Sequence, residues 1–122
     1  MTSPDSNPLA IKRGHCYLVD MNPPRRSKPG KVRPVVVLQS TDTLEIGSPG
    51  VVTVPLTTQL QPENILRIRI KPSESLQIGK ASDVLLDQIH TIDRSLFLKE
   101  LGPILAIDFQ RIENGARFLL NF

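Results

Sequence analysis

Apolar and polar residues alternate in short blocks along most of this 122-residue chain. Residues 66–71 alternate strictly between aliphatic and basic side chains, which predicts a strand with one exposed face. Residues 35–38 are an unbroken aliphatic run, which is typical of a strand buried on both faces. Three further blocks also predict strands, with a ladder break or a sheet edge near Pro55. The five predicted strands are residues 14–21, 35–39, 51–56, 66–71 and 84–92.

The last part of the chain has a helical period instead. Apolar residues recur there at spacings of three and four, which predicts a terminal helix that begins near Ala106. Gly115 lies inside this pattern and costs the helix about 1 kcal/mol relative to alanine, so the helix is expected to depend on tertiary packing. A shorter turn is expected over residues 94–98. The apolar stripe consists of Leu105, Phe109, Ile112, Ala116 and Leu119.

Several short strands followed by one helix predict an α+β fold, built as a small, strongly bent sheet or β-barrel that the helix caps. Residues 22–31 hold three prolines, a glycine and four basic residues, so they are expected to form a long exposed loop. Residues 40–50 are expected to form a second loop. Residues 1–11 are rich in Ser, Pro and Asn and are predicted to be a disordered tail. Residues 12–122 are then one domain.

Composition excludes several functional classes. The chain has no run of 18 apolar residues and no signal-peptide pattern, so a soluble protein of the cytoplasm is expected. Its one cysteine, Cys16, suits a reducing compartment and is expected to be a core residue. Two histidines and one cysteine without ligand spacing predict no metal site. Aromatic residues make up only 4% of the chain, so few side chains can stack on bases.

Basic residues gather near the beginning of the chain. Residues 12–33 hold seven basic side chains against one acid, Asp20, which gives this segment a net charge of +6. The whole chain carries only +3, and residues 83–122 carry −2. Such a local cluster is a candidate surface for phosphates or for an acidic partner. On charge alone, a solvated basic loop explains the pattern equally well.

An arginine and a proline stand directly before the buried run of residues 35–38. Pro34 has no N–H for a sheet, so it is expected at the first position of the strand, and it holds Arg33 in an extended conformation. The Arg33 guanidinium is therefore expected where the core ends. It is either a solvated charge at a strand end or a fixed cation for a ligand.

Hydroxyl and amide side chains follow two other predicted strands. Thr57, Thr58 and Gln59 come directly after residues 51–56. The two threonine hydroxyls could cap the sheet or donate to a phosphate. Gln88 lies among apolar neighbours, where a buried amide needs partners. It is expected to tie a loop to the sheet or to contact a ligand.

Several motifs in register resemble the MazF/PemK family of toxin endoribonucleases. They are RG and YLVDMNP near the start, then KVRPVVVLQS, VVTVPLTTQ and VLLDQIHTID, and the resemblance spans about residues 12–120. It implies an SH3-like barrel of the MazF, Kid and CcdB type that works as a homodimer. It also implies sequence-specific cleavage of single-stranded RNA without metal or cofactor, and neutralisation by a co-encoded antitoxin.

The resemblance assigns catalysis to Arg33 of the R-P-V motif and Thr57 of the P-L-T motif. A planar guanidinium can donate two parallel hydrogen bonds to the phosphorane formed when the 2′-OH of RNA attacks the adjacent phosphorus. The general base is left open, because arginine is a poor proton acceptor. The residues predicted to bind RNA are Arg25, Ser27, Lys28, Lys31, Pro34, Gln39, Thr58, Gln59, Gln88 and His90.

The chain departs from the family pattern at four places. His15 stands where an acidic residue is usual, and His90 where an arginine is usual. Lys28 and Pro29 replace an acid and a glutamine in the first loop, and the last helix lacks its usual S/T-P start. The two histidines are not expected to be an obligatory acid–base pair. These changes are expected to alter RNA preference and antitoxin fit, and they leave Arg33 and Thr57 untouched.

Two other functions fit the same fold. One is a toxin that is not an enzyme and poisons a protein such as DNA gyrase, although such a toxin does not need the Arg33–Thr57 pair. The other is an inactive module that binds RNA or a partner. For a toxin of this family, the basic segment predicts an antitoxin whose binding segment is acidic and disordered when free.

Overall fold

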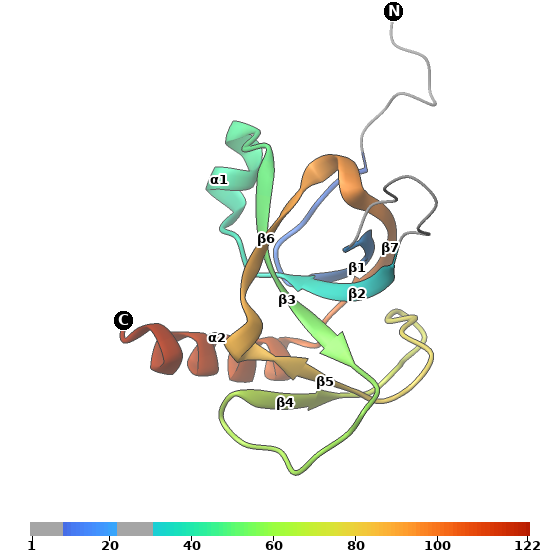
Figure 1. The fold of residues 1–122 in the computed structure, drawn as a ribbon, viewed down its shortest axis with the longest axis vertical. Coiled ribbons are helices and arrows are strands. Elements are labelled where there is room, and N and C mark those ends of the chain that lie inside the picture. Colours follow the sequence, from blue (N-terminus) through green and yellow to red (C-terminus); the bar gives the residue numbers. More distant parts are fainter. Residues whose placement is uncertain (1–8, 22–30) are drawn as a thin grey trace, which may run out of the picture.

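The computed structural model describes residues 9–21 and 31–122, and Figure 1 shows the arrangement of its elements. The strands are β1 (His15–Asp20), β2 (Val32–Val37), β3 (Gly50–Thr57), β4 (Arg67–Ile70), β5 (Ser82–Leu85), β6 (His90–Asp93) and β7 (Phe97–Pro103). The α-helices are α1 (Thr41–Ile46) and α2 (Ala106–Leu120), and the 3₁₀ turns are η2 (Leu86–Gln88) and η3 (Arg94–Leu96). The turn expected over residues 94–98 is confirmed as η3.

The strands form one antiparallel sheet of seven strands in the order β4-β5-β3-β2-β1-β7, with β6 paired to β3. Figure 1 shows how strongly this sheet bends, with α2 beside its β4–β5 end. The predicted α+β class is confirmed. The predicted barrel is only loosely correct, because β4 and β7 are edge strands and the sheet stays open.

The central strands are buried on both faces, as the aliphatic run predicted. Val36 belongs to a core cluster that includes Ile112 of α2, whereas Val35 and Val37 belong to a second cluster on the other face. All three valines have no exposed surface. Because successive residues of a strand point to opposite faces, one run of valines contributes to both clusters. Cys16 lies in the first cluster, where burial raises the pKa of its thiol to about 12.

The predicted strand 84–92 is wrong as a single element. Val84 of β5 pairs with Leu56, so an unbroken ladder would set Asp87 opposite Thr53. Thr53 instead pairs with His90, three residues later. The three residues of η2 take up this shift by leaving the ladder. The ladder break predicted near Pro55 is confirmed, because Pro55 lies between the β6 and β5 pairings of β3.

Two elements were not predicted. Helix α1 occupies the expected loop 40–50: the Ser40 hydroxyl accepts the Thr43 N–H at 3.3 Å, and Gly47 closes the helix with φ of 90°. Only Leu44 of this helix is buried, so the segment has almost no apolar periodicity. Strand β7 was missed because two charged residues stand side by side in FLKELGP, and its ladder with β1 contains register shifts.

Helix α2 begins at Ala106, as predicted, and packs against η2 and β4. Its buried positions are Ile112 and Gly115, whereas Leu105 and Leu119 at the two ends of the predicted stripe are exposed. The helix therefore touches the sheet through the middle of the stripe only. Neither α-helix within residues 9–21 and 31–122 has the length and apolar character to span a membrane.

The chain joins the domain slightly before residue 12. The Ala10 carbonyl accepts a hydrogen bond from the Tyr17 hydroxyl at 2.9 Å, and Ile11 packs against the second core cluster. Residues 1–8 of the predicted tail lie outside the described residues, so the disorder of the tail stays a prediction.

Candidate active site

A cleft of about 370 Å³ lies where β2 begins, β3 ends and η2 leaves the ladder. The segments that form it are far apart in sequence and meet because β2 and β5 flank β3. Its lining residues are Met21, Lys31, Arg33, Pro55, Leu56, Thr57, Thr58, Gln59, Leu85 and Gln88. Six of these ten were predicted as site residues from the sequence.

The register of β2 and β3 brings the two predicted catalytic residues together. Val35 pairs with Pro55, and continuing this antiparallel register by two residues sets Arg33 opposite Thr57. Residues two apart on a strand share a face, so both side chains lie on the same face of the sheet as Val35 and Pro55. Both residues line the cleft.

The Arg33 guanidinium is exposed and makes no hydrogen bond or ion pair with residues 9–21 or 31–122. Most other described arginines have partners: Arg13 contacts Glu113, and Arg94 donates to two backbone carbonyls. A guanidinium carries five N–H donors in a planar fork. Those of Arg33 are thus available to a ligand in the cleft.

The Thr57 hydroxyl has a fixed position. Its Oγ1 accepts the backbone N–H of Gln59 at 3.1 Å, a short local turn at the end of β3. This bond is the cap at the strand end that the sequence predicted as one of two roles, the other being a donor to a phosphate. Since the oxygen acts as acceptor in this bond, the hydroxyl proton is left to donate, so the cap and a bond to a phosphate are compatible.

Charge in the cleft has one sign. Lys31 and Arg33 contribute two cations, and among residues 9–21 and 31–122 no acidic side chain lines the cleft. The remaining polar lining residues carry hydroxyls and amides, and the other lining residues are apolar. This combination suits a phosphate or another anion. Within the described residues no three His, Cys, Asp or Glu side chains are placed to hold a metal ion.

Comparison with known proteins identifies the family of this chain. The family model described as PemK-like, MazF-like toxin of type II toxin–antitoxin system matches residues 12–120. The chain belongs to this family. Endoribonuclease MazF of Staphylococcus saprophyticus is 34% identical over 106 residues, which cover 86% of this chain and 87% of the relative.

Solved structures of MazF proteins share the fold. An endoribonuclease from a mycobacterial species, solved in complex with its cognate antitoxin, has a TM-score of 0.73 and 19% identity, covering 93% of this chain and 97% of its own. MazF from Deinococcus radiodurans has a TM-score of 0.72 and 19% identity, covering 93% and 99%. At this identity the likeness concerns the fold.

In this MazF-like chain, Lys31, Thr58, Gln59 and Gln88 are the predicted RNA-binding residues that line the cleft. The expectation that Gln88 is buried is wrong, because η2 carries it out of the ladder and exposes it. An exposed amide beside the cleft is accessible to a ligand. The role of these four side chains in RNA binding stays a prediction.

The two histidines lie apart. His90 is next to the cleft, with its Nε2 3.4 Å from Met21 Sδ and its Nδ1 2.9 Å from the Gln88 carbonyl. His15 opens β1, six residues before Met21 and thus roughly 20 Å along an extended chain, and its Nδ1 lies 2.6 Å from Glu100 Oε2. They therefore do not face one reacting group together.

Pro34 and Gln39 do not line the cleft. Pro34 is the third residue of β2, not its first as predicted, and it is tolerated because β2 pairs with β3 only from Val35 onward. The Gln39 side chain accepts the Val52 N–H at 2.9 Å. Their assignment to RNA binding stays a prediction, and so does that of Arg25, Ser27 and Lys28, which lie outside the described residues.

The sequence did not indicate the apolar residues that line the cleft, which are Met21, Pro55, Leu56 and Leu85. Each belongs to or borders an apolar run that predicts a strand. Such a run does not show which end another element leaves uncovered, so only the fold identifies these residues as part of the site.

Proposed function

We propose that this protein is the toxin of a type II toxin–antitoxin system and cleaves single-stranded RNA in the cleft between β2, β3 and η2. The observation that supports this most strongly is that Arg33 and Thr57 line one cleft, whose described lining residues include no acid. A toxin that acts only by binding a protein does not need an unpaired guanidinium beside a fixed hydroxyl.

The proposed reaction uses the substrate's own nucleophile. The 2′-OH of one nucleotide attacks the adjacent phosphorus, the bond to the 5′-oxygen breaks, and the products are a 2′,3′-cyclic phosphate and a 5′-OH. Arg33 stabilises the extra negative charge of the phosphorane by two parallel hydrogen bonds, and the Thr57 hydroxyl donates a third. Lys31 binds a neighbouring phosphate as a point charge. The 2′-OH loses one proton and the leaving 5′-oxygen gains one, so the reaction balances without a cofactor.

The test is a cleavage reaction in the absence of available metal. Purified protein is incubated with a long single-stranded RNA in excess EDTA, and the cut sites and end groups are mapped. We expect cuts at a short recurring sequence with 2′,3′-cyclic phosphate and 5′-OH ends, at the same rate with and without EDTA. Intact RNA, or cleavage that EDTA abolishes, would contradict the proposal.

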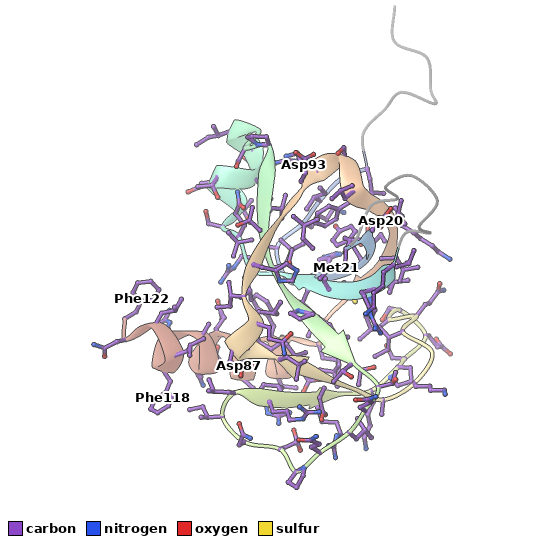
Figure 2. The ribbon with its side chains drawn as sticks, in the orientation of Figure 1. Asp20, Met21, Asp87, Asp93, Phe118 and Phe122 are labelled. Carbon is purple, nitrogen blue, oxygen red and sulfur yellow. The ribbon has the colours of Figure 1, made fainter. Side chains whose placement is uncertain are left out.

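We infer a homodimer from the apolar end of α2. Phe118 and Phe122 are 66% and 90% exposed, and Figure 2 shows both at the end of α2 that extends beyond the sheet. We expect light scattering at micromolar concentration to give the mass of two chains, and Phe118→Asp to shift it toward one. The matched control is Ile46→Asp, which changes an exposed apolar residue on α1 and should leave the dimer intact. A monomeric parent protein contradicts the inference.

The proposed partner is a cognate antitoxin with an acidic segment that is disordered when free, acting in the cytoplasm. The support is the net charge of +6 over residues 12–33. Two of the basic residues of this segment, Lys31 and Arg33, line the cleft. An acidic segment on this surface would compete with RNA phosphates for the same cations.

A further inference from the structure

Asp83 of β5 is a charged residue with no exposed surface. Burial of a carboxylate is unfavourable unless hydrogen bonds and opposite charges compensate. Its Oδ2 accepts from Arg67 Nε at 2.7 Å and from the Gln61 N–H at 3.1 Å, and its Oδ1 accepts from Arg69 Nε at 2.9 Å. Burial raises the pKa of Asp83, but these bonds outweigh it and hold the pKa below its usual range, so the carboxylate is charged at neutral pH.

The two arginines each have a second contact. Arg67 Nη2 donates to the Gln59 carbonyl and Arg69 Nη2 to the Gln61 carbonyl, both at 2.5 Å. Each guanidinium thus joins Asp83 to the backbone of the segment that directly follows β3. Asp83 binds the Gln61 N–H directly and its two arginines bind the carbonyls of Gln59 and Gln61, so the network holds three backbone groups of residues 59–61.

This segment is also part of the cleft. Gln59 lines it, and the Gln59 N–H is the group that fixes the Thr57 hydroxyl. The carbonyl of the same residue is the group that Arg67 holds. Neither Asp83 nor the two arginines line the cleft themselves. They can act on a ligand in two ways, through residues 59–61 and through the ladder in which Asp83 pairs with Thr57.

We propose that Asp83, Arg67 and Arg69 form a positioning network that sets the Thr57 hydroxyl and the Gln59 side chain for RNA cleavage. The proposal rests on the proposed function, since it assigns these residues to the same cleft. A displacement of a catalytic group by about 1 Å can lower a rate by 10². The network is therefore expected to influence turnover more than RNA binding.

The alternative is that the network only stabilises the edge strand β4. The two possibilities predict different results for Arg67→Lys. A lysine keeps a positive charge beside Asp83, but a point charge cannot bond Asp83 Oδ2 and the Gln59 carbonyl in the planar geometry of a guanidinium. The substitution therefore releases Gln59 while it leaves the buried charge compensated.

The matched control is Arg94→Lys. Arg94 also donates to two backbone carbonyls, those of Ser48 at 2.5 Å and Leu44 at 2.6 Å, and it ties α1 to the start of β3. Figure 1 shows α1 at the opposite end of β3 from β5. This control loses a comparable pair of bonds at the end of β3 away from Thr57.

The experiment measures kcat and KM on an RNA oligonucleotide that contains a cut site of the parent protein. For Arg67→Lys we expect kcat to fall about tenfold or more with KM changed by less than threefold, and for Arg94→Lys we expect parental kcat. Amide hydrogen exchange on the same proteins should show Gln59 exchanging about tenfold faster in Arg67→Lys and unchanged in Arg94→Lys.

Three results would overturn the proposal. They are a kcat of Arg67→Lys within twofold of the parent, an equal loss of kcat in Arg94→Lys, and a fall in kcat without faster exchange at Gln59. If Arg67→Lys does not fold, Arg69→Lys carries the same test at Gln61. If the parent protein cuts no RNA, the proposed function fails, whereas the exchange at Gln59 still shows whether the network holds the segment.

Discussion

Arg33→Ala should lower the rate of RNA cleavage by about 10²–10³-fold or more, because removing a single preorganised hydrogen-bond donor to a developing oxyanion has an effect of that size and Arg33 offers a charged, bidentate one. The fold should survive. Arg33 is exposed and has no partner among residues 9–21 and 31–122, so the free energy of unfolding is expected to stay within about 0.5 kcal/mol of the parent value. Cleavage of an RNA oligonucleotide and urea unfolding measure the two quantities.

Graded variants sharpen this experiment. Arg33→Lys should also be strongly impaired, since an ammonium cannot replace a bidentate guanidinium, and Thr57→Ala should lose less than Arg33→Ala. The control is Arg111→Ala, which removes the same charge from α2, outside the cleft, and should cleave at the parent rate. A folded Arg33→Ala protein that cuts RNA at nearly the parent rate would place the active site elsewhere.

Gly115→Ala should destabilise the protein by about 1–3 kcal/mol or more, although alanine is the better helix former by about 1 kcal/mol. An added Cβ would lie 2.2 Å from Leu86 Cδ1 and 2.4 Å from the Ile65 carbonyl oxygen. The leucine side chain can move, but the carbonyl is backbone, so α2 must shift away from the sheet. Urea unfolding of the two proteins gives the difference in free energy.

The neighbouring position supplies the control for this prediction. Asn114 is exposed on the same turn of α2, so Asn114→Ala gains helix propensity without a clash and should change the free energy of unfolding by less than about 0.5 kcal/mol. A Gly115→Ala protein as stable as the parent would mean that α2 does not approach the Ile65 carbonyl this closely.

The choice of Arg33 and Thr57 as site residues was possible from the sequence because it depends on local patterns. An aliphatic run marks each strand, and in each case the polar residue stands at the end of that run. Motif resemblance then assigned the two ends to one site. The register that makes them neighbours, Val35 with Pro55, came only from the fold, since nothing in either strand alone fixes which residues pair.

The Asp83 network could not be predicted for a physical reason. Arg67 and Arg69 alternate with isoleucines, which is the pattern of a strand with one solvated face. An aspartate in a strand is likewise expected to be exposed at the surface. Only the pairing of Arg67 and Arg69 with Leu85 and Asp83 gathers both arginines around the carboxylate. The sequence pattern likewise indicated that Gly115 weakens α2. In the fold, Gly115 is the point where α2 comes close to Leu86 and the Ile65 carbonyl.

The burial of β1, β2 and β3 on both faces has a consequence for how the domain loses its structure. The two core clusters lie on opposite sides of the same strands, with Val36 in one and its neighbours Val35 and Val37 in the other. Water cannot enter one cluster while the other stays packed, because exposing either one removes the packing of the strands they share. Unfolding of this domain is therefore a single cooperative event that removes the cleft together with both cores.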